Sequence, residues 1–246
     1  MESTNITFQN DILTVEKLSK AYNNTVVLDI PNLVIKKGES FGLVGNNGAG
    51  KTTLFRLVLD LIVSSSGGVL SNGVNVKGSE LWKAYTGSYL DEGFLIDFLT
   101  PEEYFKFVAS LNKMSDGDLN LFYERFKDFF NDEILGKKKY IRDLSKGNQK
   151  KVGIAAAMMT HPAVLILDEP FTNLDPSSQI RLKQMLKQEQ EEKEVTMLIS
   201  SHDLNHVTDV SKRIVVLERG VIVHDINTTD QTLRDLEDYF AAQINH

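Results

Sequence analysis

Apolar positions in the first third of the chain come in short runs that are rich in β-branched residues. Residues 12–18, 41–45 and 69–76 have this composition, which predicts strands. The dipeptide Asn72-Gly73 inside the last run is a strong signal for a tight hairpin turn. The first third is therefore predicted to be mostly β-structure.

The pattern changes to helical spacing in the middle of the chain. Residues 99–111 carry apolar side chains three and four positions apart, and Pro101 stands at the expected helix start. Residues 119–130 continue the pattern. The stretch from about 90 to 159 is therefore predicted to be helical.

Strand-like runs return after this stretch. Residues 163–167 are continuously apolar and residues 195–201 are mostly so, and both runs lead into polar residues, which is typical of parallel strands that are buried on both faces. Residues 230–246 predict one short helix. This order of elements indicates an α/β fold.

Composition narrows the functional classes. The net charge of −7 and the pI of about 5.3 argue against binding nucleic acid through a basic face, and the absence of cysteine excludes disulfides and Cys-bound zinc. Residues 154–167 are the nearest approach to a membrane span, but Thr160, His161 and Pro162 interrupt them. Residues 1–11 lack the pattern of a signal peptide. We expect a soluble, cytoplasmic chain whose membrane role, if any, comes through a partner.

One segment of the chain has the pattern of a phosphate-binding loop. Residues 45–52 match G-x-x-x-x-G-K-[ST] at every position, between a strand-like run and a helical pattern whose apolar face continues to Ile62. Glycines let backbone N–H groups turn toward phosphate oxygens, Lys51 reaches the terminal phosphates, and Thr52 offers an oxygen to Mg²⁺. The predicted nucleotide-binding residues are Gly45, Asn46, Asn47, Gly48, Ala49, Gly50, Lys51, Thr52 and Thr53.

Polar residues follow both of the later apolar runs, at the sheet edge where α/β folds place their ligands. Asp168 follows the first run and is predicted to hold Mg²⁺, directly or through water. Glu169 is next to it and is predicted to act as general base on the attacking water. His202 follows the second run, where it can bond the γ-phosphate or orient the water.

Two other classes of P-loop protein fit less well. A GTPase would carry an N-K-x-D guanine-binding motif, which the sequence lacks. A small-molecule kinase also needs a P-loop and acids, so these residues leave it open. The kinase interpretation does not explain the helical stretch and the segment LSKGN (144–148), which lie between Lys51 and Asp168.

The motifs together resemble the nucleotide-binding domain of ABC transporters, over nearly the whole chain. Their order is that of the family: GNNGAGKT (45–52), LSKGN (144–148), VLILDEP (164–170), NLD (173–175) and SSHD (200–203). The resemblance implies a P-loop NTPase core with an antiparallel β-subdomain and an inserted helical subdomain, as a single domain over 1–246. We expect the core at about 1–88 and 160–230, the helical subdomain at about 89–159 and a short tail at 231–246.

The resemblance also assigns roles to further residues. Tyr22 lies where the family has an aromatic that stacks on adenine, and His202 matches the family's switch histidine. Residues 173–175 match a loop that crosses a dimer interface. The implied cofactors are ATP and Mg²⁺, with Thr52, Asp168 and Glu92 as the residues near the metal.

Two motifs depart from the family pattern. The family signature is usually LSGGQ, whereas Lys146 and Asn148 replace a glycine and the glutamine here. Ser145 and Gly147, the phosphate-facing pair, remain. The glutamine of the family's Q-loop aligns with Glu92, which when ionised accepts hydrogen bonds but cannot donate one.

The resemblance implies a head-to-tail dimer, which explains why one chain carries two anion-binding segments. Residues 145–148 of one subunit would cap the ATP held by the P-loop of the other, which is a second copy or a homologous ATPase subunit. The helical stretch near Glu92 would pass motion to integral membrane permease subunits at the cytoplasmic face. The implied function is ATP hydrolysis that powers transport, and no nucleic-acid partner is expected.

Two finer questions have competing answers. The LSKGN variant and the lack of a long C-terminal regulatory domain favour export. In these two features the chain resembles the single-domain ATPases that serve ABC-2-type exporters. The alternative function is a soluble ABC-type ATPase in assembly or mechanical work, such as an iron–sulfur scaffold ATPase. An integral membrane protein that co-purifies would distinguish the transporter from the scaffold.

Two charged clusters are predicted to be solvent-exposed surface. The basic cluster consists of residues 137–139 with Arg142, Lys150 and Lys151, and contact with anionic lipid is its alternative. The acidic cluster is the run 189–194.

Overall fold

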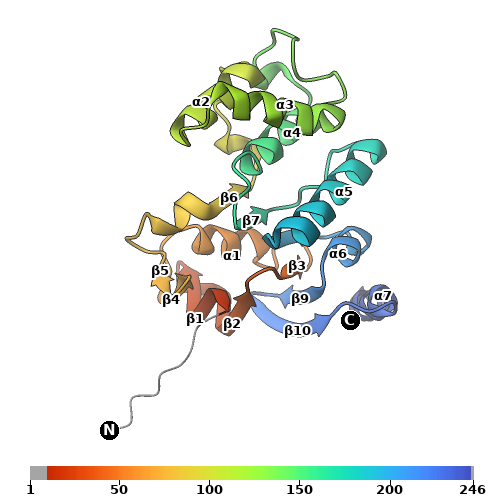
Figure 1. The fold of residues 1–246 in the computed structure, drawn as a ribbon. Helices are drawn as coiled ribbons and strands as arrows, with labels where there is room; N and C mark the ends of the chain where they lie inside the picture. The colour runs from red at the N-terminus through yellow and green to blue at the C-terminus, as the bar shows by residue number, and fades with distance from the viewer. Residues whose placement is uncertain (1–9, 245–246) are drawn as a thin grey trace.

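Two sheets packed around helix α1 form the base of the molecule (Figure 1). The computed structural model describes residues 10–244, so the predicted domain ends at 1–9 and 245–246 lie outside the described residues. The first sheet is antiparallel, with strands in the order β2-β1-β4-β5. Its strands are β1 (Asp11–Tyr22), β2 (Thr25–Lys36), β4 (Ser66–Ser71) and β5 (Val74–Asn75). Asn72-Gly73 joins β4 to β5, which confirms the predicted hairpin turn.

The second sheet has six strands in the order β10-β9-β3-β8-β7-β6, and only β10 is antiparallel. Its strands are β3 (Ser40–Val44), β6 (Thr86–Tyr89), β7 (Val164–Leu167), β8 (Thr196–Ser201), β9 (Arg213–Glu218) and β10 (Val221–Asn227). Every residue of β3, β7 and β8 is buried, which is why these strands are almost continuously apolar in sequence. The register pairs Leu167 with Ile199, so Asp168 and Ser200 follow at the same edge.

Three helices form a separate group in Figure 1, α2 (Pro101–Leu111), α3 (Asp116–Phe130) and α4 (Lys146–Ala157), and α4 also packs against β6. Thr100 and Ser115 begin α2 and α3 with complete capping boxes, each of which satisfies otherwise unpaired backbone N–H groups. Pro101 is the first residue of α2, as predicted. The 3₁₀ turns η2 (Glu92–Phe94) and η3 (Ile141–Asp143) belong to the helical stretch, whereas η1 (Leu81–Tyr85) precedes β6 and packs with the sheets.

The remaining helices correct the predicted end of one helix and include the predicted terminal helix. Helix α1 (Lys51–Val58) ends before the apolar pattern does, because Asp60 takes a left-handed φ of 50° and leaves Leu61 47% exposed. Helices α5 (Pro176–Lys193) and α6 (Leu204–Val210) follow β7 and β8. Helix α7 (Thr232–Ile244) is the predicted terminal helix. No helix within residues 10–244 is both long and apolar enough to cross a bilayer.

The prediction that the acidic run 189–194 is surface was wrong for Glu189. This side chain is buried, and its carboxylate lies 2.9 Å from Arg125 and 3.1 Å from Lys193. Arg125 belongs to α3, so the ion pair joins the helical stretch to α5. A buried carboxylate with two cationic partners is a structural contact rather than a solvated charge.

Candidate functional site

The phosphate-binding loop connects β3 to α1. Gly48 and Gly50 have left-handed φ angles of 82° and 110°, which a side chain would disfavour. Gly45 passes so close to β9 that a Cβ there would lie 2.3 Å from the carbonyl oxygen of Leu217. Lys51 begins α1, is buried, and donates to the Gly45 carbonyl at 2.6 Å. The loop therefore wraps around the Lys51 ammonium at a helix N-terminus, the arrangement that suits phosphate.

Asp168 lies at the carboxyl end of β7, in contact with the loop. The Thr52 hydroxyl donates to one carboxylate oxygen at 2.5 Å, and the Ser200 hydroxyl donates to the other. Burial raises the pKa of Asp168, and these two hydrogen bonds act in the opposite direction. Ser200 has no predicted role in the sequence, although its place at the end of the strand beside β7 is a signal that could have found it.

Glu169 lies between the loop lysine and the predicted histidine. Its carboxylate is 3.4 Å from the Lys51 ammonium and 2.8 Å from the His202 imidazole. Its backbone has a left-handed φ of 47°, and its N–H donates to Ser200 Oγ at 2.9 Å. The structure thus brings together an ammonium, two carboxylates and an imidazole at the ends of β3, β7 and β8.

Glu92 lies beside this group but has a different partner. It begins η2, and its carboxylate accepts a hydrogen bond of 2.9 Å from the Tyr89 hydroxyl, rather than one from Thr52. Asp168 connects to the same strand, because its N–H donates to the Tyr89 carbonyl at 2.9 Å. The predicted role of Glu92 near the metal stays a prediction.

Tyr22 ends β1 and is 50% exposed, with the Lys20 ammonium 4.6 Å from its ring centre. The β1–β2 hairpin reaches the phosphate-binding loop through β2, since the Val27 carbonyl would lie 3.2 Å from a Cβ on Gly50. The ring is therefore an exposed aromatic on a hairpin that touches the loop. Its predicted stacking on adenine stays a prediction.

The signature residues lie on a separate element, the start of α4. The Ser145 hydroxyl caps this helix by accepting from the Asn148 N–H at 3.2 Å, and Lys146 bonds the Gln149 side chain at 3.3 Å. A Cβ on Gly147 would lie 2.5 Å from the Asn173 carbonyl, so glycine permits a close approach between α4 and the NLD loop. Figure 1 shows α4 grouped with α2 and α3, away from α1.

The prediction of a solvated basic cluster was wrong for two of its lysines. Lys150 and Lys151 are 4% and 1% exposed, because α4 turns them toward the segment that carries the acids. The Lys150 ammonium donates to the Glu169 carbonyl at 2.8 Å and to Thr172 Oγ1 at 2.5 Å. Lys151 lies 3.4 Å from Glu133 and 3.7 Å from Asp175.

Comparison with known proteins agrees with this geometry. A family model described as ABC transporter matches residues 28–172. The bacitracin transport ATP-binding protein BcrA of Enterococcus faecalis is 32% identical over 89% of this chain and 70% of BcrA. The spermidine/putrescine import ATP-binding protein PotA of Treponema pallidum is 32% identical over 86% of this chain but only 55% of PotA. The chain belongs to the ABC transporter family.

Solved structures share the fold, which confirms the predicted P-loop α/β class. A structure described as the ATP binding subunit of an ABC transporter has a TM-score of 0.81 at 25% identity, over 96% of this chain and 100% of that one. The ATP-binding cassette MJ0796, solved as a dimer bound to ADP and Pi, has a TM-score of 0.77 over 89% of this chain and 99% of that one. At 23% identity this second likeness is one of fold alone. The chain is an ABC-type ATPase subunit.

Proposed function

We propose that this chain hydrolyses ATP to power transport through separate membrane subunits. The observation that carries the proposal is the convergence of Lys51, Glu169 and His202 within hydrogen-bond or ion-pair distance at one sheet edge. Lys51 binds the terminal phosphates, and the exposed ring of Tyr22 offers adenine a stacking surface. The proposed phosphate contacts come from residues 45–53.

The hydrolytic step follows from the placement of Glu169. Its carboxylate accepts a proton from the attacking water, and His202 holds that carboxylate or the γ-phosphate in position. The left-handed backbone at Glu169 turns the side chain away from the strand direction and toward Lys51. General base catalysis of this kind contributes on the order of 10²–10⁴-fold in rate.

The residues beside the loop also fit Mg²⁺. Thr52 and Asp168 supply a hydroxyl and a carboxylate in mutual contact, and Mg²⁺ is usually bound through one or two carboxylates plus substrate phosphates. Within residues 10–244 no group of three or more His, Cys, Asp or Glu could enclose a metal, so the phosphates would complete the ligand set. Mg²⁺ would neutralise charge on the phosphate oxygens.

The proposed working unit is a head-to-tail dimer. Ser145 and Gly147 stand at the N-terminus of α4, where backbone N–H groups and the helix dipole favour an anion. The anion would be the γ-phosphate held by the P-loop of a second copy or of a homologous subunit. A cassette of similar fold, MJ0796, has been solved as a dimer bound to ADP and Pi.

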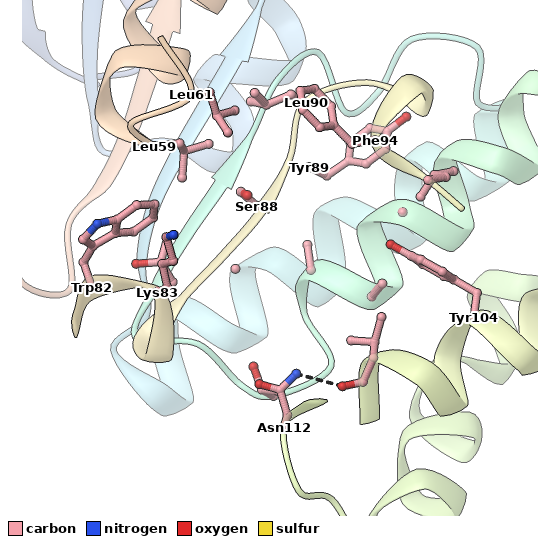
Figure 2. Close-up of a pocket in the computed structure, with 18 of the residues that line it drawn as sticks. Leu59, Leu61, Trp82, Lys83, Ser88, Tyr89, Leu90, Phe94, Tyr104 and Asn112 are labelled. Atoms are coloured by element: carbon pink, nitrogen blue, oxygen red, sulfur yellow. Dashed lines mark hydrogen bonds between the residues drawn. The ribbon is translucent and has the colours of Figure 1, made fainter. Parts of the chain in front are cut away.

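A groove between the sheets and the helical stretch is the proposed contact with the permease (Figure 2). It has a volume of about 460 Å³ and separates β6 and the end of α1 from α2. Leu61 and Phe94 at its rim are half-exposed, and Leu59, Tyr89 and Tyr104 line its wall. These apolar side chains suit an amphipathic helix of a membrane subunit, which would hold the ATPase at the cytoplasmic face.

We propose export as the direction, on the basis of the LSKGN variant. PotA, named for import, and BcrA, named for bacitracin transport, match this chain with equal identity. Direction is therefore tested separately, in sealed vesicles loaded with the cargo. Release driven by ATP inside the vesicles, on the same side as the cargo, would be export, and release driven by ATP outside them would be import.

Two measurements test the proposed function. Lys51→Ala should weaken ATP binding about 10- to 100-fold, the scale of a lost charge-assisted hydrogen bond, and should abolish measurable hydrolysis. Unchanged ATPase activity in purified Lys51→Ala would exclude this site. Purification of tagged protein from membranes should recover an integral membrane protein, and recovery of soluble assembly factors alone would favour the scaffold ATPase.

A further inference from the structure

Helix α4 is attached at three places to residues 169–175, the segment that follows β7. Its first turn touches this segment where Gly147 meets the Asn173 carbonyl. Lys151, further along, lies 3.7 Å from Asp175. Lys150 makes the contact nearest to the chemistry, because its acceptor is the carbonyl of Glu169 itself. The helix that begins at the signature and the segment that begins at the proposed base are therefore one packed unit.

Lys150 completes the support of an unusual backbone. Glu169 has a left-handed φ of 47°, a conformation that costs energy for a residue other than glycine. Its N–H is held by Ser200 Oγ at 2.9 Å, and its carbonyl accepts from Lys150 at 2.8 Å and from Thr172 Oγ1 at 2.9 Å. These hydrogen bonds hold the Glu169 backbone in the conformation from which its carboxylate contacts His202.

The charge of Lys150 also belongs to this site. Burial lowers its pKa, while the carboxylates of Glu92, Glu169 and Asp168 raise it. The two direct acceptors of its ammonium are the Glu169 carbonyl and Thr172 Oγ1. A neutral side chain of the same length would leave the Glu169 carbonyl without its charged donor.

We propose that Lys150 is a positioning residue that couples the proposed base to the signature helix of the same chain. In the proposed dimer, α4 contacts the ATP on the partner's P-loop through Ser145. The coupling then makes the placement of Glu169 at one nucleotide depend on capping of the other. This inference rests on the proposed function and adds a link between its two ATP sites.

Lys150→Met tests the coupling, since methionine keeps an unbranched apolar stem and removes the ammonium donor. We expect kcat to fall about tenfold or more, because small displacements of catalytic groups have effects of this size. The Kd for ATP should stay within about twofold, since each P-loop is intact. ATP should still dimerise the Glu169→Gln, Lys150→Met double variant. Lys150→Arg should recover part of kcat, and Lys139→Met, an exposed lysine, should match wild type.

Each outcome decides the proposal. Wild-type kcat in folded Lys150→Met overturns it, and so does loss of ATP binding in proportion to kcat, which marks a general structural role. If Lys150→Met does not fold, Thr172→Val decides: a severalfold fall in kcat at constant Kd supports the coupling, and an unchanged kcat overturns it. Absence of ATPase activity in wild type would instead overturn the proposed function.

Discussion

The two anion-binding segments of the chain differ in how far the chain itself completes them. The P-loop is already joined to its acids, because Lys51 contacts Glu169 and Thr52 contacts Asp168 within one chain. Within residues 10–244, the Ser145 hydroxyl of the signature accepts a hydrogen bond only from its own helix, through the Asn148 N–H. The proposed hydrolytic groups thus lie together in a single protomer, and we infer that the signature acts only when a second protomer binds.

The largest effect should come from a change at the P-loop and the acids that contact it. Glu169→Gln keeps the shape of the side chain but removes the base, so kcat should fall on the order of 10²–10⁴-fold while ATP still binds. A steady-state phosphate-release assay with a nucleotide-binding titration measures both. Glu191→Gln, an exposed acid on α5, serves as control. A fall of less than threefold in Glu169→Gln would contradict the role given to this carboxylate.

A smaller effect should come from the exposed Tyr22 on the hairpin that touches the P-loop. If Tyr22 stacks on adenine, Tyr22→Ala should lose about 1–3 kcal/mol of nucleotide affinity, the scale of base–aromatic stacking. Tyr22→Trp should restore it, because a larger ring keeps the stacking surface. Calorimetric titration with ATP and with an abasic triphosphate separates stacking from phosphate binding. Equal ATP affinity in wild type and Tyr22→Ala would return Tyr22 to a surface role.

The smallest effect should come from Glu92, which lies between the P-loop site and the signature helix α4. Glu92→Gln keeps an acceptor for the Tyr89 hydroxyl and removes one negative charge near Lys150. ATP binding should be unchanged, and the hydrolysis rate should shift by about two- to fivefold, the scale of one altered hydrogen bond. The rate is measured with and without the membrane partner. If neither rate changes, Glu92 does not act as the Q-loop residue.

The same contrast appears in what the sequence could predict. The P-loop, Asp168 and Glu169 follow buried parallel strands, and such strands have a strong apolar pattern that places their ends together. The register of β7 and β8 then brings Ser200 to Asp168, but pairing register is not visible in either strand alone. The sequence therefore predicted which kind of site lies at these strand ends, but it did not predict that Ser200 belongs to it.

The contacts between the helical stretch and the rest of the chain were harder to predict because their residues look like surface. Lys150 and Glu189 are charged and lie in charged runs, so composition predicts exposure. Each is buried because a partner from a distant element meets it: the Glu169 carbonyl for Lys150 and Arg125 for Glu189. A tertiary contact of this kind overrides a local pattern, and one sequence carries no record of it.

The central claim is that two chains share each ATP, and a mixing experiment tests it most directly. Two variants are prepared in the Glu169→Gln background, one with Lys51→Ala and one with Ser145→Arg. Each alone should stay monomeric with ATP, because every site of a homodimer has either a P-loop without its lysine or a blocked signature. An equimolar mixture pairs the intact P-loop of one variant with the intact signature of the other.

Light scattering after size exclusion measures the result. The account predicts that the mixture forms a dimer with ATP and not with ADP, since ATP binds the closed state better and so favours it. A mixture that stays monomeric, while Glu169→Gln alone dimerises with ATP, would contradict capping in trans.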